Sequence, residues 1–143
     1  MIEFREIRLG TPEYEAAMEL REDVLRTPLG LSFTEDELAA EPECFHLAGF
    51  QEGRLVAILL LKPLNHETVK MRQVAVDPSL QKCGAGTQLL QFAEQFARAR
   101  GFTSVIAHAR GTAAGFYRRN GYAESGAPFL ETTIPHILVC KDL

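Results

Sequence analysis

The spacing of hydrophobic residues changes from a strand pattern to a helix pattern near the start of the chain. Residues 2–9 alternate between apolar and polar side chains, which predicts an edge strand. From Pro12 onward apolar residues recur at helical spacing and Thr11 can cap this segment, so a helix is predicted over residues 12–26. Thr34 and Glu37 have the spacing of a capping box, which predicts a second helix ending near residue 40.

The rest of the chain alternates between further strand and helix patterns. Strands are predicted over residues 45–51, 55–61, 67–76, 104–109, 122–125 and 134–141, and helices over residues 87–100 and 112–120. The order strand, two helices, three strands, helix, strand, helix, two strands predicts a mixed α/β fold. The length of 143 residues suits one domain, so residues 1–143 are expected to form a single unit.

The strand predicted over residues 67–76 has an unusual pattern. Val69 and Met71 place apolar side chains on odd positions, whereas Val74 and Val76 place them on even positions. A strand alternates faces with a period of two, so one extra residue near 72–73 would bring these side chains onto one face, as in a β-bulge. The alternative is a strand whose C-terminal end is buried on both faces.

Composition narrows the class of protein. The chain is 46% hydrophobic and 24% charged, as in ordinary globular domains, and its longest purely apolar run, residues 55–61, is too short to cross a membrane. The first residues lack the layout of a signal peptide, so a cytoplasmic location is expected. The formal charge of −4 and the scattered basic residues give no reason to expect nucleic acid as a partner.

Cysteine spacing and sheet edges give two further expectations. The three cysteines lie far apart with no Cys-x-x-Cys pair, which argues against a disulfide framework and a zinc site, so no metal is expected. The exposed edges of a mixed sheet could pair with a second copy of the chain, which makes a homodimer plausible.

Residues 81–87, Gln-Lys-Cys-Gly-Ala-Gly-Thr, form a loop that could hold a pyrophosphate. Glycines let backbone amides turn toward one point, and the N-terminus of the next helix adds unpaired N–H groups and partial positive charge. Lys82 and Thr87 add a cation and a hydroxyl. An ordinary strand-to-helix turn is the alternative. The Walker pattern fits worse because Thr87 follows Gly86 where it needs lysine, and the dinucleotide pattern lacks its third glycine.

The strand end at residues 74–76, the loop at 81–86 and the segment 114–122 together resemble the GNAT superfamily of N-acetyltransferases. The loop is similar to that family's Gln/Arg-x-x-Gly-x-Gly/Ala signature. The pair Phe116-Tyr117 with Gly121-Tyr122 is similar to its Phe-Tyr-x-x-x-Gly-Phe/Tyr signature. The resemblance covers nearly the whole chain and implies the acyl-CoA N-acyltransferase fold, acetyl-CoA as cosubstrate, and an amine of a small molecule or a peptide as acceptor.

The resemblance also implies where the cosubstrate binds. In GNAT folds a bulged strand splays from the next parallel strand, and pantetheine lies in the gap between them. Gly111 departs from the family pattern, which often has a cofactor-contacting asparagine there, and Arg110 is the expected substitute. The residues expected to bind acetyl-CoA are Val74, Ala75, Val76, Gln81, Lys82, Cys83, Gly84, Ala85, Gly86, Thr87, Arg110, Phe116 and Arg119.

The resemblance implies a catalytic acid, whereas the catalytic base stays open. Tyr117 matches the tyrosine that protonates the departing CoA thiolate, and a phenol with an ordinary pKa near 10 is protonated at neutral pH. The alternative for Tyr117 is a partly buried helix residue with its hydroxyl in water. Candidates for the base are His136, Glu131, Glu37 and a water held by backbone carbonyls; Glu131 and His136 belong to a run similar to one in a bacterial GNAT subgroup.

Other side chains and other activities also stay open. His108 points either toward the cleft or into the sheet, and Arg21 either pairs with an acceptor carboxylate or forms an ordinary surface salt bridge. The alternatives to acetyl transfer are a module that binds acetyl-CoA without turnover and a transferase for a longer acyl chain.

Overall fold

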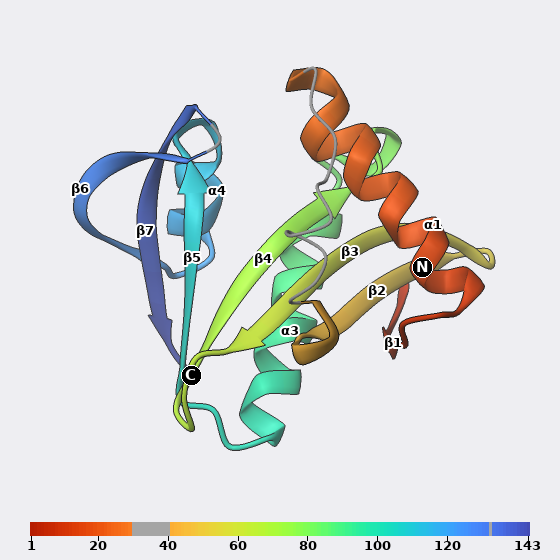
Figure 1. Ribbon diagram of the computed structural model, residues 1–143, viewed down its shortest axis with the longest axis horizontal. Coiled ribbons are helices and arrows are strands. Elements are labelled where there is room, and N and C mark those ends of the chain that lie inside the picture. The colour runs from red at the N-terminus through yellow and green to blue at the C-terminus, as the bar shows by residue number, and fades with distance from the viewer. Residues whose placement is uncertain (30–40, 132) are drawn as a thin grey trace.

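The computed structural model describes residues 1–29, 41–131 and 133–143. Within these residues the strands form one seven-stranded mixed sheet (Figure 1). The strands are β1 (Glu3–Ile7), β2 (Phe45–Gln51), β3 (Arg54–Pro63), β4 (Thr68–Val76), β5 (Ser104–Arg110), β6 (Ala123–Glu131) and β7 (Ile134–Asp142). Their order is β1-β2-β3-β4-β5-β7-β6, and β4 and β5 are parallel while the other neighbours are antiparallel.

Helices cover both faces of the sheet. Helix α1 (Pro12–Arg21) lies in front of β2 to β4 in Figure 1, and α3 (Ala85–Ala99) lies behind the sheet. A π-helical turn, Glu22–Arg26, extends α1, and the short helix α4 (Ala114–Arg119) follows β5. Short 3-10 turns occupy Thr27–Leu29, Glu41–Glu43, Pro78–Leu80 and Gly111–Ala113. Across the described ranges, none of the helices has the length and apolar character that spanning a membrane requires.

Most sequence predictions of fold are confirmed. The fold is mixed α/β, and the observed elements begin and end close to the predicted ones. The Tyr14 amide donates to the Thr11 hydroxyl at 3.3 Å, which is the predicted cap of α1. The helix predicted over residues 34–40 lies outside the described residues.

The strand predicted over residues 122–125 is wrong in length, because β6 continues to Glu131. Gly126 and Pro128, which follow the predicted strand, are residue types that usually weaken or end a strand. The structure accommodates both in an irregular stretch, where the register with β7 shifts between Ser125 and Phe129 and Gly126 adopts a φ of 76°. The extension places Glu131 on a strand of the sheet.

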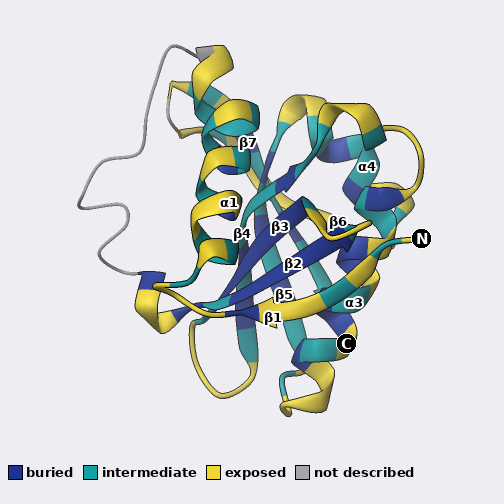
Figure 2. Ribbon diagram, turned by 90° about the vertical axis from the view of Figure 1, so that its right-hand side faces the viewer, coloured by how far each residue is buried: buried dark blue, intermediate teal, exposed yellow. Residues whose placement is uncertain are grey.

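Two hydrophobic cores hold the sheet between its helices. One core joins the sheet to α3 through side chains such as Leu89, Leu90 and Ala93, and the other joins it to α1 through Ala17 and Ile58. Figure 2 shows β2 and β3 buried along most of their length. Burial on both faces gives the middle of the sheet a fixed geometry, which positions the strand ends beside it.

The bulge predicted in β4 is confirmed. Ile58 of β3 pairs with Ala75, and Leu60 pairs with Arg72, so β4 contains one more residue than β3 over this stretch. Gln73 adopts a φ of 56°, in the left-handed region that a bulge can require.

The bulge explains the change of parity in the sequence. Val74 and Val76 pack against the same core as Val69 and Met71, although they lie on positions of opposite parity. Ala75 belongs to the core on the other face. The C-terminal end of β4 therefore has a bulge and also packs on both faces, so the two interpretations of the sequence both hold.

Candidate active site

β4 and β5 separate where their parallel pairing ends. The pairs run from Thr68 with Ser104 to Met71 with Ala107, and none follows in the described chain. The bulge of β4 comes directly after this point. Figure 1 shows the two strands diverging toward the end of the sheet at which α4 lies. Because backbone polar groups need partners, this separation leaves two strand edges on which a ligand can form hydrogen bonds.

The edge of β4 that faces the gap belongs to Val74 and Val76. The Asp77 amide donates to the Val56 carbonyl at 2.8 Å, so it points toward β3. Backbone groups alternate sides along a strand, which turns those of Val74 and Val76 toward β5. The Gln81 side-chain amide already donates to the Val76 carbonyl at 3.1 Å. An extended ligand could continue the sheet at the remaining groups of this edge.

A cavity of about 570 Å³ opens at the separation. Its walls come from the π-helical turn after α1, from β4 on both sides of the bulge, from the end of β5 and the turn after it, and from Tyr117, Glu131 and His136. This volume is within the range of small-molecule pockets.

The loop before α3 forms a helix N-terminus next to the bulged strand. α3 begins at Ala85, earlier than predicted, and Gly84 precedes it with a φ of 83°. The first amides of a helix have no partners within it, and the positive end of the helix dipole favours an anion there. A Cβ atom on Gly86 would lie 3.1 Å from the Phe116 ring, so the absence of a side chain lets α3 pack closely on α4.

Tyr117 reaches the cavity from α4 and is almost completely buried. Its side chain is 6% exposed, and its ring lies 5.4 Å from the rings of both Phe116 and Tyr122. Burial raises the pKa of Tyr117 to about 12. The phenol is therefore protonated at neutral pH and can donate a hydrogen bond into the cavity.

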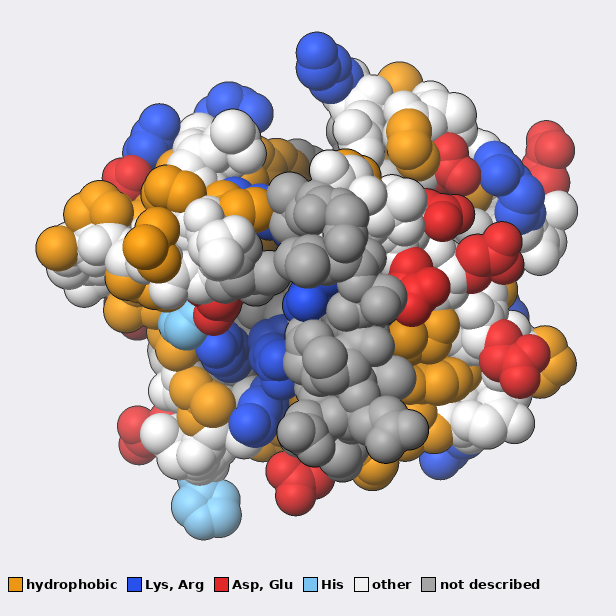
Figure 3. Space-filling model, turned by 45° about the horizontal axis from the view of Figure 1, so that its top comes forward, with side chains coloured by type: hydrophobic (Ala, Val, Ile, Leu, Met, Phe, Trp, Pro, Cys, Tyr) orange, Lys and Arg blue, Asp and Glu red, His pale blue; other side chains and the backbone are white. Residues whose placement is uncertain are grey.

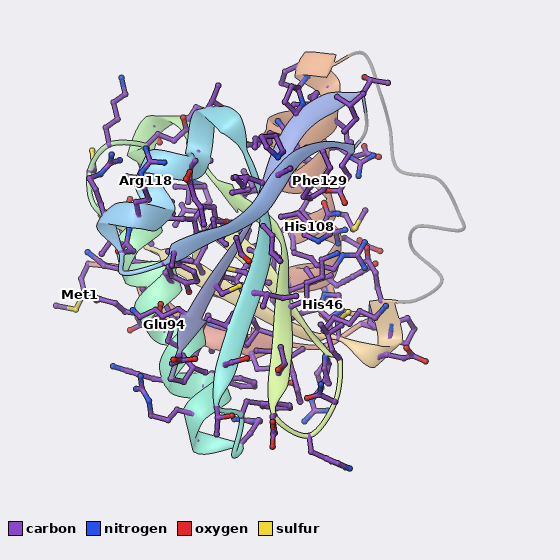
Figure 4. All side chains as sticks on the ribbon, turned by 90° about the vertical axis from the view of Figure 1, so that its left-hand side faces the viewer. Met1, His46, Glu94, His108, Arg118 and Phe129 are labelled. Carbon is purple, nitrogen blue, oxygen red and sulfur yellow. The ribbon has the colours of Figure 1, made fainter. Side chains whose placement is uncertain are left out.

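Three titratable side chains from three strands meet at another wall of the cavity. His108 Nδ1 lies 2.9 Å from one carboxylate oxygen of Glu131, and His136 Nε2 lies 3.6 Å from the other. Phe129 packs against both imidazoles, with ring-centroid distances of 4.9 Å to His108 and 6.1 Å to His136. Figure 4 shows His108 and Phe129 close together. We call His108, Glu131 and His136 the carboxylate–histidine cluster.

Hydrogen bonds determine which nitrogens of the cluster carry protons. Burial opposes ionisation of Glu131, but the hydrogen bond from His108 and nearby positive charge outweigh it and lower the pKa of Glu131. An ionised carboxylate only accepts, so His108 donates from Nδ1 and its Nε2 is an acceptor in the neutral ring. His136 Nδ1 lies 2.7 Å from the Ile134 carbonyl and donates in the same way, while its Nε2 faces Glu131.

Comparison with known proteins settles the family. The family model described as acetyltransferase (GNAT) family matches residues 5–122. The chain belongs to the GNAT acetyltransferase family. The predicted resemblance and the prediction of an acetyl-CoA-dependent N-acetyltransferase are thereby confirmed at the level of the family.

Individual GNAT proteins are similar along nearly the whole chain. The uncharacterized N-acetyltransferase YitI of Bacillus subtilis (strain 168) is 27% identical over 150 residues, covering 96% of this chain and 97% of that protein. An acyl-CoA N-acyltransferase from Pseudomonas aeruginosa superposes with a TM-score of 0.84 at 24% identity, covering 99% of each chain. A GNAT family acetyltransferase from Elizabethkingia anophelis, solved with acetyl-CoA bound, superposes with a TM-score of 0.77 at 18% identity. The match covers 99% of this chain and 98% of that chain. Both structures have the predicted fold.

The GNAT cavity brings part of the predicted site together. The predicted residues that line it are Val74, Gln81, Arg110, Tyr117, Glu131 and His136. Residues 82–87 surround the N-terminus of α3 instead, Arg119 is exposed, and Phe116 packs at Gly86. The Ala75 side chain points into the core on the α1 side, and Ala75 pairs with Ile58 of β3, so its backbone faces away from the gap. Glu37 lies outside the described residues.

Arg21 is not at the surface, so the expected surface salt bridge is wrong. It is buried, and Arg21 Nη1 donates to Glu41 at 2.8 Å. The Tyr14 hydroxyl donates to the same carboxylate at 3.2 Å. Arg21 shares the inward helical stripe with Ala17 and Val24, and this spacing could have indicated its burial from sequence.

Sequence reasoning missed two charged residues of the cavity, Lys70 and Arg72, and left the place of His108 open. Lys70 and Arg72 line the cavity and were not predicted, although they alternate with the core residues Val69 and Met71. His108 was left open between the cleft and the sheet interior, and it lines the cavity. Its partner Glu131 is 23 positions away, and no local pattern indicates that pairing.

Proposed function

We propose that the chain transfers the acetyl group of acetyl-CoA to a primary amine of a small molecule or a peptide. The observation that carries the proposal is a single cavity bordered by the bulged end of β4, the diverging end of β5 and Tyr117. The neighbour from Elizabethkingia anophelis, which has the same fold, was solved with acetyl-CoA bound. We further propose that residues 1–143 form one catalytic domain that acts in the cytoplasm.

On the donor side, acetyl-CoA binds mainly to backbone. Its pantetheine arm continues the sheet at the open edge of β4, beside Val74. Its pyrophosphate lies at the N-terminus of α3, where the amides of residues 84–87 point outward and Lys82 supplies a cation. Arg110 and Arg119 contribute further positive charge from the end of β5 and from α4. This arrangement directs the thioester toward the cavity.

Tyr117 acts as the acid for the departing thiolate. A phenol whose pKa burial raises to about 12 keeps its proton at neutral pH. As the amine attacks the thioester carbonyl and the carbon–sulfur bond breaks, negative charge develops on sulfur. The Tyr117 hydroxyl donates a hydrogen bond to that sulfur and supplies the proton of the CoA thiol, and solvent later restores the proton to Tyr117.

The carboxylate–histidine cluster supplies the base. The neutral His108 ring has an unprotonated Nε2, and Glu131 holds the ring by its Nδ1 proton. His108 therefore takes the proton that the attacking amine must lose. Glu131 thus positions His108 and balances the positive charge that it gains, and His136 Nε2 lies 3.6 Å from the other oxygen of the same carboxylate.

A thiol-release assay tests the proposal directly. The protein is incubated with acetyl-CoA and a panel of amino acids, polyamines, aminosugars and short peptides, and free CoA and acetylated amine are quantified. We expect release that depends on one class of amine and gives equal amounts of both products. Acetyl-CoA binding with no release for any amine would contradict acetyl transfer and favour a binding module. Release only with butyryl-CoA or longer donors would favour a longer acyl group.

A further inference from the structure

Two cations on β4 face the cavity on the side of the sheet opposite α3. Val69 and Met71 point into the core beneath α3, so strand alternation turns Lys70 and Arg72 to the other face. Both line the cavity, together with Arg110 of β5. Figure 3 shows Lys and Arg side chains gathered near the middle of its view.

The cavity has more positive than negative charge. Glu131 is its acidic side chain within the described ranges, and Glu131 is already bonded to His108 at 2.9 Å. Arg110 donates to the Leu25 carbonyl at 3.0 Å, which fixes its position without neutralising its charge. The charged residues that line the cavity are Arg26, Lys70, Arg72, Arg110 and Glu131.

Among the side chains that the structure describes, burial makes this concentration of positive charge unfavourable. Burial lowers the pKa of Lys70, although the negative charge of Glu131 opposes the shift. Burial, with repulsion from Arg26, also lowers the pKa of Arg110. An anion among these side chains would offset both desolvation and repulsion. The cavity thus has the electrostatics of a preformed anion site beside the position of acyl transfer.

Acetyl-CoA does not supply the anion for this site. Its pyrophosphate fits the N-terminus of α3, and residues 82–87 are absent from the cavity lining in the described chain. The pantetheine arm and the acetyl group, which would enter the cavity, carry no charge. A negative group bound at Lys70 and Arg72 therefore belongs to the acceptor.

We propose that the acceptor is a small amine that carries an anionic group, and that Lys70 and Arg72 bind this group while the amine meets His108 and Tyr117. A carboxylate and a phosphate share the required chemistry, because the Arg72 guanidinium can bind either through two parallel hydrogen bonds and Lys70 acts as a point charge. This proposal rests on the proposed acetyl transfer and selects one class among its acceptors.

The test compares amines that differ only in the anionic group. The ω-amino carboxylates from glycine to 6-aminohexanoate are each compared with their amides, and O-phosphoethanolamine is compared with ethanolamine. We expect kcat/KM to be at least about tenfold higher for the anionic member of the best pair. Arg72→Met and Lys70→Met should each raise the KM of the anionic amine about tenfold. Both variants should leave the KM of the neutral amine and the affinity for acetyl-CoA unchanged.

Lys62→Met is the matched control, because Lys62 pairs with Lys70 across β3 and β4 but does not line the cavity. The Lys62→Met variant should keep the preference for the anionic amine over its neutral partner. Neutral amines that react as fast as anionic ones, or a preference that both cavity variants retain, would overturn the proposal. If no amine is turned over, thermal shift of the CoA complex replaces kinetics, and no extra stabilisation by any anionic member would also overturn it. Failure of acetyl transfer itself is distinct, because it appears as acetyl-CoA binding without release of CoA for any amine, anionic or neutral.

Discussion

The donor half of the cavity is built from backbone, whereas the acceptor half is built from side chains. On the donor side, the bulge at Gln73 and the helix N-terminus after Gly84 present peptide groups. On the acceptor side, His108, Glu131 and Lys70 come from three different strands. Peptide groups are the same for every residue type, but each side chain has its own chemistry. One donor half can thus serve many acceptors, and the acceptor half determines which amine reacts.

A change at Gly84 should produce the largest effect. Gly84→Glu adds bulk and a negative charge at the proposed pyrophosphate site, and the loss of two charge-assisted hydrogen bonds predicts acetyl-CoA affinity roughly 100-fold lower. Isothermal calorimetry measures the dissociation constant. Gly10→Glu is the control, because Gly10 and Gly84 have φ of 77° and 83° and neither has an atom within 4 Å of an added Cβ. Equal affinity in the two variants would contradict the assignment of the loop.

Removal of the Tyr117 hydroxyl should affect catalysis but not the binding of acetyl-CoA. Tyr117→Phe should lower kcat by roughly 100-fold because the thiolate loses its proton donor, while acetyl-CoA affinity stays the same. Steady-state kinetics and calorimetry on one sample measure both quantities.

Tyr122→Phe controls for the loss of a buried phenol. The Tyr122 hydroxyl donates to Glu94 at 2.8 Å, and Tyr122 does not line the cavity. This variant should lower the free energy of unfolding by about 1 kcal/mol and keep its kcat. An unchanged kcat in Tyr117→Phe would remove Tyr117 from the reaction.

A change at Glu131 tests the acceptor half. Glu131→Gln should lower kcat about tenfold, because His108 loses the carboxylate that holds it, and acetyl-CoA affinity should not change. Glu124→Gln is the control on the same strand, since Glu124 pairs with Arg118 and lies outside the cavity lining. A weaker acetyl-CoA complex in Glu131→Gln would show that the two halves are not separate.

The effect of Glu131→Gln on the free energy of unfolding should depend on pH. The pKa of Glu131 is lowered in the folded state, so its ionised form contributes stability above the unfolded value of 4.5, and this contribution is lost as pH falls through the folded pKa. Chemical denaturation should therefore show wild type more stable than Glu131→Gln at pH 7, with a difference that shrinks below pH 4.5. A difference independent of pH would contradict the ionised cluster.

The smallest effect is expected where the chain departs from the family pattern. Gly111 has no atom within 4 Å of an added Cβ, so Gly111→Asn fits without rearrangement. The new amide should improve acetyl-CoA affinity by about three- to tenfold through one hydrogen bond, whereas Gly111→Ala should not. Competition binding measures this change, and equal affinity in the two variants would mean that the asparagine contact has no counterpart here.

The difference between backbone and side chains also decides what could be predicted from sequence. The bulge was predictable because apolar parity changes between Met71 and Val74, and the loop was predictable because its glycines occupy characteristic positions. Local patterns therefore identified the fold and the bulge, and they are the basis of the proposed donor half. The length of β6 was not predictable, since Gly126 and Pro128 usually end a strand and pairing with β7 outweighs that tendency.

The acceptor half depends on contacts between segments that are distant in sequence. His108 meets Glu131 because β5 and β6 both neighbour β7, and Arg21 meets Glu41 because α1 packs over the sheet. Neither contact leaves a local signal, since a histidine or arginine has the same appearance in sequence whether it is paired or free. Strand register brings His108 to Glu131, and the packing of α1 on the sheet brings Arg21 to Glu41.

The most direct measurement of the central claim is calorimetric titration of wild type and Glu131→Gln with acetyl-CoA and with CoA. A donor half built from backbone should bind both ligands in a saturable one-to-one complex, with similar affinity in the two proteins. No binding by folded wild-type protein would contradict the account.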